Sequence, residues 1–149
     1  MIICNHVVAG GLIGVALQGH PVAAFAVGMA SHFVLDAIPH WGIDPTREDG
    51  EAYFISVAKK DGCAGCALLG ATWWLSPDKL SMAAAMVGSC LPDLDKPYEY
   101  FTKKKLFPAW FRRFHGRIQT ESESRGRQEI VTLVGGLVVL GFVLWRSRH

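Results

Sequence analysis

The stretch Ile130–Trp145 reads I-V-T-L-V-G-G-L-V-V-L-G-F-V-L-W and contains neither a charged residue nor a polar face. A run of this length without strict alternation of apolar and polar residues favours a helix over a strand. It ends in a tryptophan followed by Arg146 and Arg148, which is the arrangement of an anchor at a membrane–water interface. The stretch therefore predicts a helix that lies in a membrane.

Four segments upstream have the same apolar character and are also expected to be helices. They are about Val7–Leu17, Pro21–Ile38, Gly62–Leu75 and Leu80–Leu91. Short turns follow the first and third segments, and Ser76 is expected to cap the fourth helix. Most segments are shorter than the ~20 residues of a perpendicular span, so a compact soluble helical domain is the alternative. The sequence predicts an all-α protein, a small integral membrane bundle of about five helices.

The composition is that of one domain of this kind. Half of the 149 residues are hydrophobic, and the 16 glycines lie partly inside the apolar runs, where they allow helices to approach closely. The net charge of +2 is too small to predict nucleic-acid binding. Within a single domain 1–149 we expect core hairpins at 1–96, a basic aromatic loop at 97–129 and a C-terminal helix at 130–149.

The four cysteines do not form a recognisable metal or disulfide framework. Cys63 and Cys66 make a C-x-x-C, but no second pair follows at the spacing of a zinc finger. Their surroundings are rich in glycine and alanine, which favours small residues that pack between helices. A redox or zinc role for the pair is the alternative.

Charge predicts how the helices are oriented. If all five cross the membrane, the N-terminus, the second-to-third connection and the fourth-to-fifth connection share one side. That side carries twelve Lys and Arg residues, and the other carries Lys79, Arg146 and Arg148. The twelve are Arg47, Lys59, Lys60, Lys96, Lys103, Lys104, Lys105, Arg112, Arg113, Arg117, Arg125 and Arg127. Because cytoplasmic loops carry the excess of positive residues, this side is expected to face the cytoplasm.

Eight His and Asp residues fall on or near that same side, although they played no part in assigning it. They are His6, His32, Asp36, His40, Asp61, Asp93, Asp95 and His115, whereas His20 and His149 fall on the other side. Ionisable residues at membrane depth are costly and usually functional. The collection therefore predicts a polar, metal-binding face.

The spacing of these residues suits metal ligands. His32 and Asp36 are four apart and so lie on one helical face, where two ligands can hold one ion. His40 continues the spacing beyond Pro39. Asp93 and Asp95 form a compact pair of carboxylates just after the fourth helix. We expect all five, together with the His at the start of the first helix, His6, to bind metal.

Two residues have a structural explanation that is equally good. Asp61 precedes the third apolar segment and would serve as its N-cap. His115 would be an exposed histidine of the long polar loop.

Histidine and carboxylate donors without a thiolate suit Zn²⁺, with Mn²⁺ or Fe²⁺ as alternatives, and their number allows one or two ions. Such a site lowers the pKa of a water ligand and predicts hydrolysis of an ester or phosphoester of a lipid-like substrate. Asp95 or His115 would be the general acid or base. The basic aromatic stretch Lys103–Phe114 would meet lipid head groups. No G-x-S-x-G and no phosphate-binding G-x-x-x-x-G-K-[ST] motif occurs.

The order of these motifs resembles the YdjM-like family of membrane-bound, metal-dependent hydrolases. The likeness runs from His6 to His115 and rests on S-H-F-V-L-D-A-I-P-H at Ser31–His40 and L-P-D-L-D at Leu91–Asp95. It implies His6, His32, Asp36, Asp93 and Asp95 as the polar core of the site. The family's later H-R-G-x-T-H-S has its nearest match in F-H-G-R-I-Q around His115, which lacks the second His and the Ser. A more distant likeness is to helical, zinc-dependent enzymes of the phospholipase C type.

Two other functions fit the same residues. One is a non-catalytic membrane module, in which the cluster is a structural metal site and the basic loop binds a partner. The other is an ion-handling protein or transporter, for which a polar path through the bundle towards His20 would be the sign.

Overall fold

The computed structural model describes residues 1–43, 48 and 50–148, and within these ranges the chain is helical and forms no strand. The prediction of an all-α protein is confirmed. The elements are α1 (Ile3–Ala16), α2 (Pro21–Ala37), α3 (Gly50–Leu75), α4 (Lys79–Cys90), η1 (Leu91–Leu94), α5 (Asp95–Thr102), α6 (Ala109–Ile118), η2 (Glu123–Arg125) and α7 (Gly126–Arg146). Arg47 and His149, counted above, lie outside the described residues.

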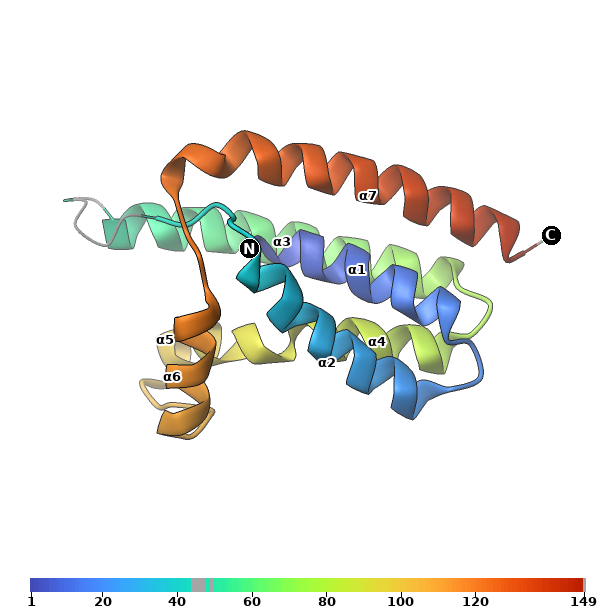
Figure 1. Cartoon of the computed structure of the whole chain (residues 1–149), viewed down its shortest axis with the longest axis horizontal. Helices are drawn as coiled ribbons and strands as arrows, with labels where there is room; N and C mark the ends of the chain where they lie inside the picture. Colours follow the sequence, from blue (N-terminus) through green and yellow to red (C-terminus); the bar gives the residue numbers. More distant parts are fainter. Residues whose placement is uncertain (44–47, 49, 149) are drawn as a thin grey trace.

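The apolar helices α1, α2, α3, α4 and α7 lie along the long axis of the molecule (Figure 1). At one end, which we call the turn end, are the α1–α2 turn, the α3–α4 turn and the C-terminus. At the other, which we call the polar end, are the N-terminus, α5, α6 and the start of α7. The chain thus passes back and forth between two ends, and α1 packs against α2, α3, α4 and α7.

Two sequence predictions about helix starts are wrong. The third helix begins at Gly50, so Asp61 lies inside α3 and cannot be its N-cap. Its carboxylate instead accepts the Ile3 and Cys4 N–H groups at 2.6 and 3.3 Å, and so caps α1, which has no cap in its own sequence. Asp78, and not Ser76, caps α4. In both cases a carboxylate satisfies the free N–H groups of a first helical turn.

The segment 97–129 is not a plain loop. It contains most of α5 and all of α6, and α7 begins four residues before the predicted Ile130. Both short helices are amphipathic, with exposed Phe101 and Trp110 on their outer faces. The apolar pattern did not indicate them because both helices are short and mix aromatic with charged residues.

The core is narrow and depends on small residues. Its buried residues come from α1, α4 and α7: Val7, Val8, Met82, Met86, Leu140 and Leu144. At Gly28 of α2 an added methyl group would overlap the backbone of Ala85, and at Gly88 of α4 it would overlap the backbone of Phe25. The absence of a side chain at these two positions is what lets α2 and α4 touch.

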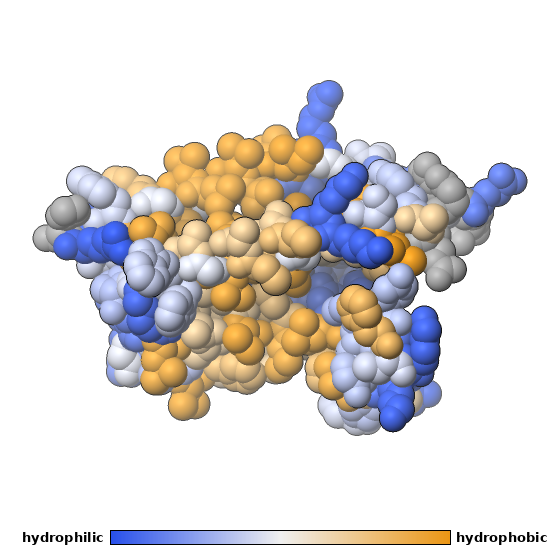
Figure 2. All heavy atoms as spheres, turned by 180° about the vertical axis from the view of Figure 1, so that it is seen from behind, coloured by the Kyte–Doolittle hydropathy of each residue, from blue (hydrophilic) through white to orange (hydrophobic). Residues whose placement is uncertain are grey.

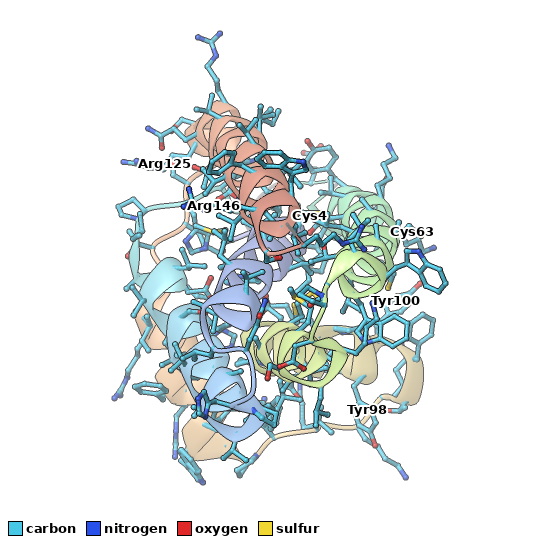
Figure 3. All side chains as sticks on the ribbon, turned by 90° about the vertical axis from the view of Figure 1, so that its right-hand side faces the viewer. Cys4, Cys63, Tyr98, Tyr100, Arg125 and Arg146 are labelled. Atoms are coloured by element: carbon cyan, nitrogen blue, oxygen red, sulfur yellow. The ribbon has the colours of Figure 1, made fainter. Side chains whose placement is uncertain are left out.

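The cysteines divide into an inner and an outer set. Cys4 is buried among the helices, and Cys63 lies on the outer side of α3 (Figure 3). Cys66 is also exposed, and all four cysteines are free thiols. The interpretation of Cys63 and Cys66 as packing residues is therefore wrong, because both side chains are exposed within the described part of the chain.

One stretch of the described residues, Glu123–Arg146, is long and apolar enough to cross a membrane, and only 17% of its most apolar window is buried. Helices α1 and α2 are apolar but shorter. Apolar residues cover the middle of the face shown in Figure 2, and hydrophilic residues gather towards the two ends. Ile130, Val131 and Val138 of α7 are each more than 60% exposed.

Candidate metal centre

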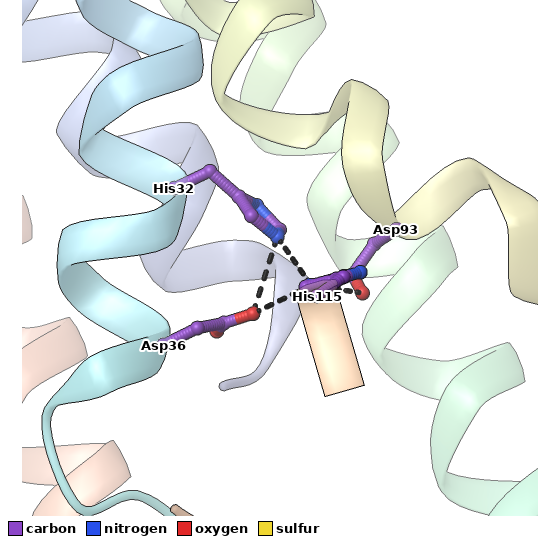
Figure 4. A group of neighbouring side chains, drawn as sticks. All are labelled: His32, Asp36, Asp93 and His115. Carbon is purple, nitrogen blue, oxygen red and sulfur yellow. Dashed lines mark hydrogen bonds and ion pairs between the residues drawn. The ribbon is translucent and has the colours of Figure 1, made fainter. Parts of the chain in front are cut away.

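Helix α2 carries two polar side chains on the face it turns to the bundle. His32 and Asp36 are both 0% exposed, and His32 Nε2 lies 3.1 Å from Asp36 Oδ2. The helix places them there because residues four apart lie on one face. Figure 4 shows the two side chains directed to the same point, as the sequence spacing predicts.

Helix α6 brings His115 to that point from a distant part of the chain. The segments after α2 and α6 lie side by side, with the His40 N–H donating to the Thr120 carbonyl at 3.0 Å and the Ser122 N–H to the His40 carbonyl at 2.9 Å. His115 is therefore buried rather than exposed. Its Nε2 lies 2.9 Å from Asp36 Oδ2 and 3.0 Å from His32 Nε2.

Asp93 approaches from η1, the short helix that continues α4 through Pro92. Its Oδ1 lies 4.0 Å from His115 Nε2 and 3.1 Å from Lys96 Nζ. Burial raises the pKa of Asp93, but Lys96 and His6 outweigh it, so the pKa lies below its usual value and the group is a carboxylate at neutral pH. Ligand atoms of His32, Asp36, Asp93 and His115 all lie within 4.8 Å of one another, so these four could hold a metal ion.

The hydrogen bonds of His32 suit a metal ligand. Its Nδ1 lies 2.8 Å from the Ser89 carbonyl, which can only accept, so the proton is on Nδ1 and the lone pair of the neutral ring is on Nε2. In the neutral ring that lone pair would face Asp36 Oδ2 and His115 Nε2, where a metal ion could accept it. Metal-binding histidines characteristically donate their second ring N–H to a carbonyl in this way.

The spacing of the three closest donor atoms also fits a metal. His32 Nε2, His115 Nε2 and Asp36 Oδ2 are separated by 2.9 to 3.1 Å. Ligand atoms of a tetrahedral zinc site, with bonds of about 2.0–2.1 Å, lie roughly 3.3 Å apart. Small movements of the side chains would bring the triangle to that size, so the residues present fit such an ion.

His6 of α1 lies beside this group and is completely buried. Its ring stacks on that of His32, with centroids 4.2 Å apart and planes 23° apart. Its Nε2 is 3.3 Å from Asp36 Oδ1, and neither ring nitrogen makes a hydrogen bond. The amino group of Met1 lies 3.2 Å from the same oxygen.

Three other predicted site residues are not brought to the cluster. The Asp95 carboxylate accepts the N–H groups of Leu106 and Phe107 at 2.6 and 3.3 Å, and so holds the connection between α5 and α6. The Nδ1 of His40 donates to a nearby carbonyl, and its Nε2 lies 3.7 Å from Glu121. Asp61 caps α1, as described above. The expected ligand roles of Asp95 and His40 do not agree with these positions.

Sequence reasoning missed several residues that support the centre. Gln119 donates to Asp36 Oδ2 at 3.2 Å. Buried Glu129 accepts the Asn5 side-chain amide at 2.6 Å and the Trp41 N–H at 3.2 Å, which ties α7 to α1 and to the end of α2. Gln119 follows His115 by four residues, so helical spacing would have indicated it had α6 been recognised as a helix. Glu129 had no such signal.

Comparisons of the chain with known protein families, with curated proteins and with solved structures find no match.

Proposed function

We propose that this chain is a membrane-bound, metal-dependent hydrolase, as the resemblance to the YdjM-like family implies. The observation that carries the proposal is the convergence of His32, Asp36, Asp93 and His115 from three separate elements. Histidine and carboxylate donors suit Zn²⁺ best, with Mn²⁺ or Fe²⁺ as alternatives. When bound, such a cation supplies Lewis acidity that polarises an ester or phosphoester and makes water a nucleophile at neutral pH.

The surface supports the membrane part of the proposal. At the turn end, Trp74 and Trp145 are 71% and 60% exposed, and Lys79 Nζ lies 5.5 Å from the ring centre of Trp73. Exposed tryptophans together with cations are characteristic of a membrane–water interface. The apolar band between this end and the polar end would then be covered by lipid, with the shorter helices tilting or thinning the bilayer locally.

Charge supports an orientation with the polar end in the cytoplasm, because most Lys and Arg residues belong to that end. There α5 and α6 present Phe101, Trp110 and Phe114, which are 78%, 65% and 47% exposed. Basic side chains accompany these rings, with Lys103, Lys104 and Lys105 just after α5 and Arg112, Arg113 and Arg117 in α6. Such an amphipathic unit would lie on the membrane surface among anionic head groups.

A cavity of about 160 Å³ beside the cluster supports a lipid-like substrate with an anionic group. It is lined by His115, Lys96, Arg112, Phe107 and Phe111 among others. Burial lowers the pKa of Lys96, but Asp93 outweighs it and raises the pKa, so the ammonium stays charged. Arg112 Nε is buried without a hydrogen-bond partner and lies 4.0 Å from Asp95 Oδ2. The two cations would bind the anionic group, and the two rings would contact apolar chain.

Elemental analysis of the native protein purified in detergent tests the first step. We expect a stoichiometric transition metal, its loss in the double variant His32→Ala/Asp36→Ala, and its retention in His20→Ala at the turn end. The metal-loaded protein should hydrolyse a chromogenic phosphodiester or short-chain ester, and the double variant should not. Absence of metal from the native protein, or unchanged metal in the double variant, would overturn the proposal.

A non-catalytic membrane module with a structural metal is the second candidate, with the basic surface of α5 and α6 binding a partner. The observation in its favour is burial, since the side chains of His6, His32 and Asp36 have no exposed surface. A protein that contains metal, unfolds on chelation and hydrolyses neither ester would support this function.

A further inference from the structure

Asp36 and Asp93 each direct their two carboxylate oxygens to different histidines. Asp36 Oδ2 faces His32 and His115 at 3.1 and 2.9 Å, whereas its Oδ1 faces His6 Nε2 at 3.3 Å. Asp93 repeats the pattern, with Oδ1 4.0 Å from His115 Nε2 and Oδ2 4.0 Å from His6 Nε2. The two carboxylates therefore lie between two separate groups of histidine nitrogens, in the manner of bridging ligands.

His6 provides an independent observation. It is fully buried, yet neither of its ring nitrogens has a hydrogen-bond partner. Buried polar groups are nearly always satisfied, so an orphan of this kind indicates an ion or molecule beside it. The amino group of Met1 lies 3.2 Å from Asp36 Oδ1, and a second ion bound at that oxygen would replace it.

The stacked rings set the distance between the two groups. The imidazoles of His6 and His32 lie 4.2 Å apart at 23° to one another, and the Nε2 of each is directed to a different oxygen of Asp36. Two ions held by parallel rings would lie about as far apart as the rings. Two-metal sites have separations of about 3.5–4 Å.

We propose that the centre binds two divalent cations bridged by Asp36 and Asp93. His32 and His115 complete the first position, and His6 is the histidine of the second. The inference rests on the proposed function only in requiring that the cluster binds metal. A two-metal centre also limits the class of substrate. Two divalent cations against two carboxylates leave an excess of positive charge, which favours an anionic phosphoester over a neutral carboxylic ester.

Metal stoichiometry tests the proposal without an activity assay. The full chain in detergent is loaded with Mn²⁺, freed of excess ion and measured by elemental analysis and electron paramagnetic resonance. We expect two ions per chain with the signal of a coupled pair. His6→Ala should retain one ion, with the six-line spectrum of isolated Mn²⁺, and His20→Ala should retain two. Circular dichroism confirms that the variants are folded.

The outcomes distinguish failure of the two-metal centre from failure of the proposed hydrolase function. One uncoupled ion in the wild-type chain, or two ions in folded His6→Ala, overturns the two-metal centre and leaves the proposed hydrolase standing. No bound Mn²⁺ and no other metal in the wild-type chain overturns both. The wild-type measurement alone is sufficient if His6→Ala does not fold.

Discussion

Gly28 lies on α2 one turn before His32, where an added methyl group would overlap the carbonyl of Ala85 on α4. We predict that Gly28→Ala lowers both the stability of the fold and the affinity of the centre for metal. The overlapping atoms belong to the backbone, so they cannot rotate away as the end of a side chain could. The two helices must instead separate locally by on the order of 1 Å, because interiors are close-packed.

The expected size of the effect follows from two opposing contributions. Overpacking costs about 1–3 kcal/mol, and replacing a helical glycine by alanine returns roughly 0.5–1 kcal/mol. A net loss of about 1–2 kcal/mol corresponds to a fall in melting temperature of roughly 2–8 °C in a chain of this size. The same movement stretches the 2.8 Å bond from His32 to the Ser89 carbonyl of α4. Loss of such a supporting contact weakens metal binding by about 10–100-fold.

Gly70→Ala is the matched control, because a methyl group at Gly70 of α3 meets no atom within 4 Å. It should stabilise the helix slightly and leave metal affinity unchanged. Both variants are unfolded by heat in the same detergent, with tryptophan fluorescence as the signal, and metal affinity is measured by competition with a chelating dye. If Gly28→Ala melts at or above Gly70→Ala and binds metal equally well, the close approach of α2 and α4 does not support the centre.

Two further predictions concern the ends and the outer surface. Asp78 accepts the N–H groups of Gly19, Leu80 and Ser81, which lower its pKa to about 2. Asp78→Ala should lower the free energy of unfolding by about 1 kcal/mol. Because the pKa of Asp78 is depressed in the folded state, the wild-type protein should lose this stabilisation as pH falls from 3.8 towards 2. Melting curves of both proteins across that range test this, and an equal dependence of melting temperature on pH in the two would contradict it. In lipid vesicles, Cys63 should react with a membrane-permeant maleimide but not with a charged one; rapid labelling by the charged reagent would show that water, not lipid, covers it.

Local sequence predicted much of the fold. Apolar runs separated by Gly, Pro and Asp indicated five helices and two short turns, since these signals depend only on neighbouring residues. The predictions were wrong where a residue contacts a partner that is distant in the sequence. Asp61 precedes an apolar run and looked like its cap, but it faces α1, 58 residues away in sequence. Helices α5 and α6 were read as loop because they are short and their aromatic residues are mixed with charged ones.

The sequence predicted which residues gather at one end of the molecule, but it did not predict which of them contact one another. The predicted topology placed eight His and Asp residues at one end, and the structure brings five of them together. These are His6, His32, Asp36, Asp93 and His115. The structure directs Asp95 to backbone N–H groups instead. Two carboxylates two residues apart leave a helical turn in different directions, so the sequence could not tell which one faces the bundle.

The sequence by itself determined that the fold is all-α, that successive helices run in opposite directions, and that His32 and Asp36 share one helical face. Each of these depends on local spacing. The sequence placed His115 on the same side and offered it as a general acid or base, and only the tertiary structure decided that its ring contacts Asp36. His115 is 79 positions from Asp36, and its ring reaches the carboxylate only because the segments after α2 and α6 are hydrogen-bonded to each other. Contacts at this separation depend on how helices pack, a property that no short stretch of sequence carries.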